Sequence, residues 1–374
     1  MGLISRRSLR NLSSFLAALL LFPVFAEADG ITSGPTEINT STYDGLGCVI
    51  KTDSDTVRHF FRSASSSGYV SGSSIKLQSF DISDSTWGTA TDIYTDPDAD
   101  LEVRDVCGGV IGSSIYLFFA RRSDANTFVD IGFIKSTDLT GASWSSYTVV
   151  FDTSGLRFNV HGAMMDTDAT TTFLQTFFHH TNGVDFQDKV FRTTDSGSNW
   201  SVYTTVADTA TDWGEPACAF AGSGRIFCLL RDNDGGFMGQ VTSTDNGATW
   251  SSPAATAIGD ASAVKVPFAF AERDTNTALA LFTDRTGTGP LLLSVTPIPD
   301  VMSSPSNWTA TVQLDTGLTA LGYPSMVSIG LGEYLIVYSK EKSGADADIQ
   351  WLIYEVTQTS LSTTGLTLNG VTLN

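Results

Sequence analysis

Cationic side chains end, or closely follow, one apolar segment in each of six regions of this 374-residue sequence. The six are Arg62, Arg121, His179, Arg231, Arg285 and Lys340. A guanidinium group presents a planar fork of donors that matches a carboxylate. If these segment ends share one face of the fold, they form a cationic ring that concentrates anionic ligands on an otherwise acidic protein. The alternative is a set of separate charges solvated in loops.

A carboxylate and a phenol stand at the starts of two other apolar segments. Glu215 lies in Trp213-Gly214-Glu215-Pro216, and Tyr323 lies in Tyr323-Pro324-Ser325-Met326. A carboxylate beside a phenol can take its proton and so activate the phenol oxygen as a nucleophile. Two structural alternatives stand beside this hypothesis: Glu215 pairs with an arginine to stabilise a loop, and Tyr323 is a core aromatic.

A short motif marks the elements that must position these groups. It reads Ser/Thr-x-Asp-x-Gly-x-x-Trp and occurs twice, 50 residues apart, ending at Trp200 and at Trp250. The Asp carboxylate can accept N–H bonds within its own turn, and the Gly can take a positive φ. The Trp supplies a large apolar plug. The motif therefore predicts a self-closing hairpin, and we expect Asp195 and Asp245 to be structural.

The motif belongs to a repeat that runs along the chain. Each unit reads as apolar strand, turn, apolar strand, loop, third strand, motif and fourth strand. The tryptophans Trp87, Trp144, Trp200, Trp250 and Trp308 stand at intervals of 57, 56, 50 and 58 residues, and a sixth unit without the motif follows. The first copy lacks the Gly and, like the second, is one residue longer. Helix-period stretches are absent, which indicates an all-β chain.

The motif resembles the Asp-box, or bacterial neuraminidase repeat, of the sialidase superfamily. The resemblance implies an all-β, six-bladed β-propeller of four-stranded antiparallel blades, with residues 29–374 as one domain. Because each blade must bury both faces, the ring has to close. We expect either the segment near Gly34–Thr42 or the tail near Leu366–Leu373 to supply the outer strand of the last blade.

The fourth repeat carries the most specific likeness. Its Trp213-Gly214-Glu215-Pro216 stretch, followed by Arg231, resembles the sialidase segment with a Glu at the head of an inner strand and an Arg ending the next. By that resemblance Tyr323 is the nucleophile and Glu215 is the base that activates it. Arg231 and Arg285 are then two of the three arginines that hold the substrate carboxylate.

The first repeat departs from the family pattern. Sialidases usually open with an Arg-Ile-Pro run, but this strand reads Asp44-Gly45-Leu46-Gly47-Cys48, so the first arginine of the triad is missing from its place. Arg62 or Arg104 could reach the pocket instead. The family's acid/base Asp lies in a first-blade loop, and the loop 63–71 here contains no carboxylate. Asp105 or Asp44 could take that role.

The N-terminus predicts an exported protein. Three arginines precede an apolar run over Phe15–Phe25 and an Ala26-Glu27-Ala28 cleavage site, so we predict a signal peptide over residues 1–28 and a secreted or periplasmic location. The Arg6-Arg7 pair also resembles a twin-arginine signal, against an ordinary basic n-region. We expect no membrane insertion, since no stretch is long enough to span a bilayer. The net charge of −19 argues against nucleic-acid partners, and we expect a monomer.

Four cysteines suit an oxidising compartment. Cys218 and Cys228 flank the turn at 222–224 and could face each other in a hairpin, whereas Cys48 and Cys107 fall at similar places in successive repeats. Disulfides and buried thiols both fit these positions, and the pairing cannot be read from spacing alone.

We expect no cofactor. His161 and the His179-His180 pair could bind a metal, but no carboxylates with suitable spacing accompany them, which favours structural roles. The acidic run Asp96-Pro97-Asp98-Ala99-Asp100 could hold a structural Ca²⁺, and a plain turn is the simpler interpretation.

Three functions fit these observations. The resemblance favours a secreted sialidase-like exo-glycosidase that acts on acidic sugar termini of sialoglycoconjugates, with an anionic glycan as its partner. The missing first arginine and acid/base Asp favour a catalytically silent carbohydrate-binding propeller. Another exo-glycosidase or a polysaccharide lyase on the same scaffold is the third, because a fold does not determine its function.

Overall fold

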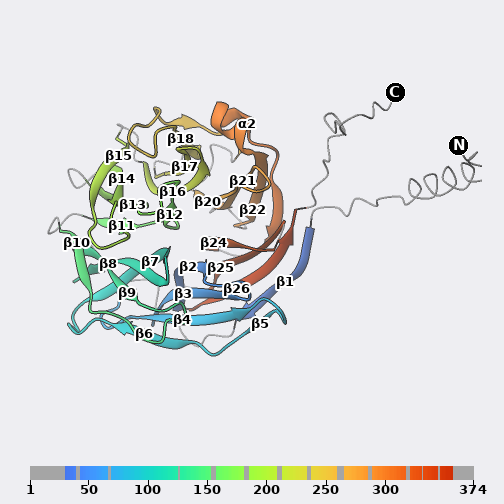
Figure 1. Ribbon diagram of the computed structural model, residues 1–374. Helices are drawn as coiled ribbons and strands as arrows, with labels where there is room; N and C mark the ends of the chain where they lie inside the picture. The colour runs from blue at the N-terminus through green and yellow to red at the C-terminus, as the bar shows by residue number, and fades with distance from the viewer. Residues whose placement is uncertain are drawn as a thin grey trace, which may run out of the picture.

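Six antiparallel sheets stand as blades around one central axis (Figure 1). The computed structural model describes residues 30–38, 43–65, 69–124, 127–152, 157–180, 185–208, 213–233, 237–258, 265–284, 289–316, 321–330, 332–343 and 346–356. The predicted all-β, six-bladed propeller is confirmed. The predicted signal peptide lies outside the described residues.

The first three blades run outward from the axis in chain order. Blade 1 contains β2 (Tyr43–Lys51), β3 (Thr56–Ala64), β4 (Ser74–Asp81), and β5 (Thr86–Trp87) with β6 (Thr91–Thr95), which both pair with β4. Blade 2 contains β7 (Glu102–Ile111), β8 (Ser114–Arg122), β9 (Phe128–Ser136) and β10 (Thr148–Phe151). Blade 3 contains β11 (Phe158–Val160) with β12 (Met165–Asp166), then β13 (Phe173–His180), β14 (Phe186–Thr193) and β15 (Ser201–Ala207).

Blades 4 and 5 repeat this order, and blade 6 differs only in its outer strand, which comes from the N-terminus. Blade 4 contains β16 (Trp213–Gly222), β17 (Arg225–Asp232), β18 (Gly239–Ser243) and β19 (Ala254–Ala255). Blade 5 contains β20 (Lys265–Glu272), β21 (Thr277–Asp284), β22 (Leu291–Pro297) and β23 (Val312–Asp315), with the short helices α2 (Ile298–Ser303) and η1 (Pro305–Asn307) in place of a box. Blade 6 contains β24 (Leu321–Gly330), β25 (Glu333–Ser343), β26 (Asp346–Glu355) and β1 (Gly30–Ile38).

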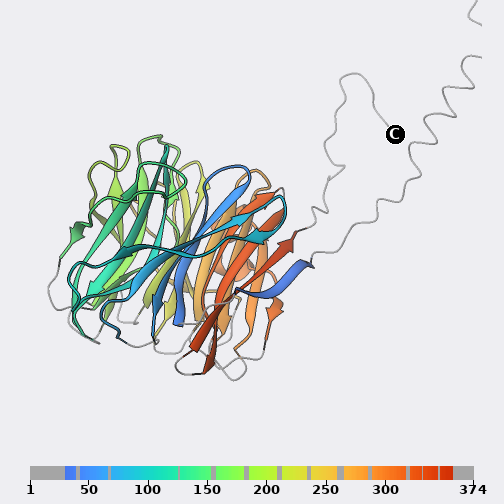
Figure 2. The ribbon, with the colours of Figure 1, turned by 90° about the horizontal axis from the view of Figure 1, so that it is seen from below.

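The N-terminal segment closes the ring. Strand β1 pairs antiparallel with β26 from Gly30↔Glu355 to Ile38↔Ile349, so the first strand of the chain is the outer strand of the last blade (Figures 1 and 2). Of the two predicted closing segments, the N-terminal one is therefore correct, although it begins earlier than expected. The C-terminal alternative near Leu366–Leu373 lies outside the described residues.

The two complete boxes fold as the sequence predicts. Asp195 Oδ1 accepts hydrogen bonds from the Asn199 amide at 2.9 Å and from Thr193 Oγ1 at 2.7 Å, and Asp245 repeats this pattern. The Gly197 φ is +82°. Hydrogen bonds from Asn199 and Thr193 lower the pKa of Asp195 to about 2. This contribution to stability is present above the ordinary Asp pKa and is lost as the pH falls toward 2.

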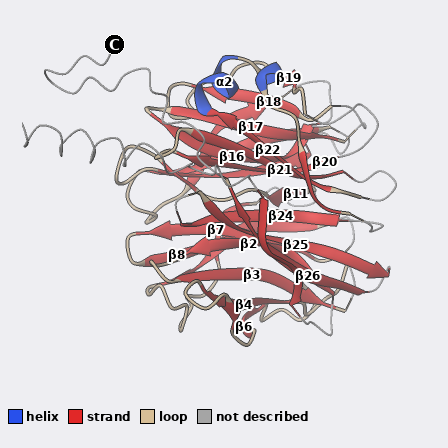
Figure 3. Cartoon of the chain, turned by 90° about the vertical axis from the view of Figure 1, so that its right-hand side faces the viewer, coloured by secondary structure: helices blue, strands red, loops and turns tan. Residues whose placement is uncertain are grey.

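Each box tryptophan packs against the blade that precedes its own. Trp144 of blade 2 meets Phe60 edge to face, and Trp200 of blade 3 meets Phe118 in the same way with ring centroids 4.8 Å apart. Trp87 of blade 1 reaches Trp351 of blade 6. These contacts join neighbouring sheets, so the repeated spacing of the tryptophans explains the ring. Strands make up most of the described chain, and α2 lies at one edge of it (Figure 3).

A disulfide joins the two inner strands of blade 4. Cys218 lies directly opposite Cys228 in the β16–β17 ladder, and their sulfurs are bonded. Cys48 and Cys107 are free and buried. The bond lies three residues from Glu215 on one strand and three from Arg231 on the other, so it fixes the spacing of these two strands beneath both side chains.

Removing this disulfide should lower the stability of the propeller. We expect Cys218→Ala/Cys228→Ala to reduce the free energy of unfolding by about 2–3 kcal/mol, because the closed loop no longer restricts the unfolded chain. Urea denaturation followed by tryptophan fluorescence measures the change. Wild-type protein reduced in denaturant is the control and should show the same loss. An unchanged midpoint for both would show that the bond contributes nothing.

Candidate active site

Three inner strands share one irregularity near their start. The register of each with its neighbour shifts at this point, and the residue within the shift has a positive φ. These residues are Asp105 in β7 (51°), Glu215 in β16 (49°) and Tyr323 in β24 (45°). Non-glycine residues rarely adopt this conformation, and a bulge re-aims a side chain. All three residues predicted to be catalytic therefore stand on the same strained backbone feature.

The tyrosine and the glutamate meet across the propeller axis. Tyr323 Oη donates to Glu215 Oε1 at 2.7 Å, although the two residues are 108 positions apart. Arg231 Nη1 donates to the same carboxylate oxygen at 2.7 Å. Glu215 is 7% exposed and the Arg231 side chain 17% exposed, so this cluster is largely shielded from water. The contact expected between Tyr323 and Glu215 is present. Glu215 also pairs with an arginine, but this pair includes Tyr323, so neither structural alternative accounts for the whole cluster.

Arg231 is held in its charged form. Burial by itself lowers the pKa of Arg231, but Glu215 and Tyr323 raise it above the ordinary arginine value. A permanently charged guanidinium beside a phenol favours the phenolate over the neutral form. The same group has five N–H donors and retains capacity to bind an anionic ligand while it contacts Glu215.

Asp105 brings a second carboxyl group to this cluster. Burial raises the pKa of Asp105, and the charge of Glu215 raises it further, while Arg104 and His161 oppose the shift. Its Oδ1 is buried, lies 4.0 Å from Arg104 Nε, and makes no hydrogen bond to the described part of the chain. A raised pKa favours the protonated form of a carboxyl group, which is the form that acts as a general acid.

His161 is a site residue that the sequence did not single out for this role. Its ring lies edge-on to Tyr323 with centroids 5.9 Å apart, and its Nε2 lies 3.0 Å from the Pro267 carbonyl oxygen. That contact assigns a proton to Nε2, because a carbonyl can only accept. Its position in the repeat could have identified it, because His161 stands at the start of the third repeat as Glu215 stands at the start of the fourth.

Arg62 and Arg104 belong to a buried ion cluster around one carboxylate. Glu102 is fully buried and pairs with Arg62, with Arg122, and with Arg104 Nη1 at 3.6 Å. Arg62 is only 1% exposed, whereas the Arg104 side chain is 19% exposed. Of the two arginines proposed to replace the missing first one, Arg104 is the one with access to solvent and with a contact to Asp105.

Two other candidates lie where side chains are not described. Arg285 falls in residues 285–288, outside the described part of the chain. Asp44 belongs to β2, but its side-chain position is not described.

The cationic segment ends are mostly paired with acids. Arg121 donates to Asp130 at 2.6 Å and to Asp96 at 3.2 Å, and Lys340 donates to Asp315 at 3.2 Å. His179 contacts Gln187 and a carbonyl oxygen. They are therefore neither a continuous cationic ring nor solvated loop charges, and Arg231 is the described member of the set that reaches the axial cluster.

The potential metal ligands have other partners. The His161 and His179 contacts above occupy ring nitrogens, and Asp96 accepts from Tyr94, Arg121 and the Asp98 amide. Within the ranges the structure describes, no group of three or more His, Cys, Asp or Glu side chains is arranged to hold a metal ion. None of the described helices is long and apolar enough to cross a membrane.

Comparisons with known proteins identify the family and the scaffold. Residues 59–336 match the sequence profile of the BNR repeat-like domain family. No curated protein matches the chain. A protein of unknown function from Dyadobacter fermentans superposes with a TM-score of 0.74 at 17% identity, covering 88% of this chain and 99% of that one.

Two structures of named enzymes share the fold. The Hadza microbial sialidase Hz136 superposes with a TM-score of 0.68 at 16% identity over 84% of this chain and 66% of its own. The α-L-arabinofuranosidase Arb93A from Fusarium graminearum superposes at 0.55 with 10% identity over 89% of this chain and 99% of its own. These identities establish a shared fold alone. Because the family profile extends from the first blade to the sixth, the chain belongs to the BNR repeat-like domain family and has the six-bladed propeller found in sialidases.

Proposed function

We propose that this protein is a secreted glycoside hydrolase that removes an acidic sugar, of the sialic acid class, from the end of a glycan. The observation that carries the proposal is the contact of Tyr323 Oη and Arg231 Nη1 with the same oxygen of Glu215. A phenol, a base that can take its proton and a fixed cation for a carboxylate are the groups that such a reaction needs. The sialidase and the arabinofuranosidase that share this fold support the proposal.

In this proposal the reaction has two steps. Tyr323 Oη attacks the anomeric carbon while Glu215 accepts the phenol proton and Arg231 holds the sugar carboxylate. The glycosidic C–O bond breaks, and Asp105 donates a proton to the departing oxygen. In the second step a water molecule attacks the anomeric carbon and gives a proton to Asp105, while the sugar–tyrosine bond breaks and Glu215 returns its proton to the Tyr323 oxygen. Asp105, Glu215 and Tyr323 thereby regain their starting states.

The decisive assay is turnover by the purified chain without its leader. We expect hydrolysis of a fluorogenic aryl sialoside and none of an aryl α-L-arabinofuranoside. Hydrolysis of the arabinofuranoside alone would replace the proposed substrate class. No turnover of either substrate, together with binding on a sialylated glycan array, would select the second candidate described below.

Asp105→Asn tests the acid role through the leaving group. The acid matters most when the leaving oxygen is basic, so we expect kcat to fall about 10²–10⁴-fold on sialyllactose and far less on an aryl sialoside. In the wild type, activity on sialyllactose should decline as the pH rises through the raised pKa of Asp105, because the acid must be protonated. That decline should vanish in the variant.

Asp166→Asn is the control for a change of Asp to Asn, since Asp166 also lies on an inner strand but is exposed. It should leave both substrates and the pH profile unchanged. Equal losses on the two substrates in Asp105→Asn would assign Asp105 to binding instead of proton transfer.

A carbohydrate-binding protein without turnover is the second candidate. It is favoured by the burial of Arg62 against Glu102, which leaves the first blade with no described arginine directed to the substrate carboxylate. In that case the axial cluster would bind an acidic sugar, and substitution of Arg231 would abolish binding.

A further inference from the structure

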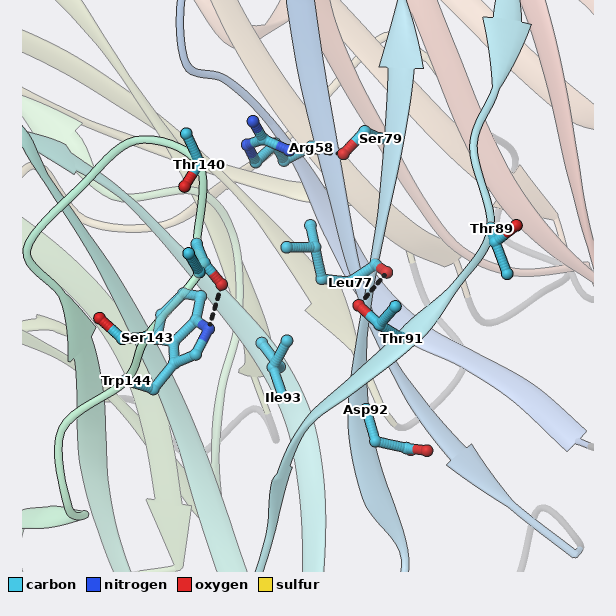
Figure 4. Close-up of a pocket in the computed structure, with 12 residues that line it drawn as sticks. Arg58, Leu77, Ser79, Thr89, Thr91, Asp92, Ile93, Thr140, Ser143 and Trp144 are labelled. Atoms are coloured by element: carbon cyan, nitrogen blue, oxygen red, sulfur yellow. Dashed lines mark hydrogen bonds between the residues drawn. The ribbon is translucent and has the colours of Figure 1, made fainter.

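Two cavities lie at the outer rim, away from the axial cluster. One, of about 610 Å³, lies between blades 1 and 2 and is lined by Arg58 and Leu77 of blade 1, by Thr89, Thr91, Asp92 and Ile93, and by the second box with Trp144 (Figure 4). The other, of about 660 Å³, lies between blades 6 and 1 and is lined by Trp87 and Trp351. Thr89 lines both cavities, so they adjoin at this residue. We call them together the rim groove.

The rim groove lies at the box end of the strands. Arg58, in its wall, stands on β3 opposite Ile50 near the far end of β2, whereas Arg62 on the same strand is opposite Gly45 near the start of β2. Asp105, Glu215 and Tyr323 lie near the starts of their inner strands. A ligand in the rim groove would therefore not compete with one at the axis.

The groove exists because the first two boxes depart from the repeated pattern. The fourth strand of blade 1 is broken into β5 and β6, and Thr89, which lies between them, lines both cavities. The blade 2 box is one residue longer than the complete boxes and places Trp144 in the other wall, where Nε1 donates to the Gly141 carbonyl at 2.9 Å. Neither irregularity serves the axial cluster.

Its lining combines aromatic rings with hydroxyl groups. Two half-buried tryptophans, Trp87 and Trp144, and the buried Trp351 border the two cavities. The exposed residues Thr89, Thr91, Thr140 and Ser143 add hydroxyl groups to the lining. Flat rings bury the apolar C–H face of a pyranose, while hydroxyls both donate to and accept from sugar hydroxyls. Each cavity has the volume range of a small-molecule site.

Charge selects the class of sugar. Arg58 is fixed by hydrogen bonds from Nε to the Leu139 carbonyl at 2.6 Å and from Nη1 to Ser79, and Asp92 and Glu37 also line the cavities. The groove therefore has one cation against two acids, on a chain of net charge −19, which disfavours an anionic glycan. We propose that the rim groove binds a neutral oligosaccharide of about two or more sugar units, at a site separate from the axial cluster.

Filling the groove tests the proposal. Thr91→Trp and Ser143→Trp each place a large ring in the cavity between blades 1 and 2 from an exposed position. Ala254→Trp is the matched control, because Ala254 is an exposed residue of the outer strand of blade 4. The probes are neutral oligosaccharides printed on an array, followed by calorimetric titration of the best one, with free sialic acid as competitor. Circular dichroism verifies the fold of each variant.

We expect the wild type and Ala254→Trp to bind at least one neutral oligosaccharide, and both groove variants to bind it at least about tenfold more weakly. Free sialic acid should not compete, and turnover of an aryl sialoside, if present, should be equal in all four proteins. The proposal is overturned if no neutral probe binds at millimolar concentration, if the groove variants bind as well as the wild type, or if free sialic acid displaces the probe. Failure of sialoside turnover would contradict the proposed function and leave this result standing.

Discussion

Tyr323→Phe is expected to lower kcat for an aryl sialoside by at least about 10³-fold, because the variant lacks the oxygen that attacks the anomeric carbon. The affinity for sialic acid should change little, since Phe fills the same space and Arg231 retains its charge and its contact with Glu215. Single-turnover kinetics and calorimetric titration measure the two quantities separately.

Tyr338→Phe provides a matched control on the same blade. Tyr338 is buried on β25 and its Oη donates to Asp315 at 2.7 Å, so this variant also removes a phenol–carboxylate hydrogen bond. It should cost stability and leave kcat unchanged. If Tyr323→Phe retained wild-type turnover, Tyr323 could not be the nucleophile, and a loss of affinity equal to the loss of kcat would make it a binding residue.

Glu102→Gln is expected to lower the free energy of unfolding by about 3–5 kcal/mol, which is the typical cost of leaving buried charges without their partner. Glu102 is completely buried and is the carboxylate shared by Arg62, Arg104 and Arg122. Its neutral amide cannot balance three guanidinium groups. Urea denaturation at neutral pH measures the loss.

Glu272→Gln is the control for a change of Glu to Gln on an inner strand. Glu272 is only partly buried at the end of β20, so its loss should alter stability by about 0.5 kcal/mol or less. A cost below about 1 kcal/mol for Glu102→Gln would show that water reaches the arginines. A stable variant with altered ligand affinity would instead show that the cluster mainly sets the position of Arg104.

The axial cluster and the rim groove lie at opposite ends of the strands. The bulges at Asp105, Glu215 and Tyr323 direct polar groups to one end of the inner strands, where a charged sugar can be held. The rim groove lies beside the two irregular boxes, at the other end of the strands. One end is therefore organised by backbone strain and charge, and the other by aromatic and hydroxyl surface.

The six-bladed fold could be predicted from local patterns in the sequence. The boxes at Trp200 and Trp250 are local structures, since Asp195 and Asp245 bond within their own turns, and a local motif at regular spacing reports the repeat directly. It also singled out Glu215, Arg231 and Tyr323, because each stands at a strand end that the repeat makes recognisable.

Which of these groups are in contact depends on the tertiary structure. The contact between Tyr323 and Glu215 joins residues 108 positions apart, and ring closure alone brings blades 4 and 6 together at the axis. Three other features also depend on long-range packing: β1 is the closing strand, Arg62 is buried against Glu102, and His161 lies beside Tyr323. Charge partners and strand closure depend on contacts between distant blades, which have no local signature in a sequence.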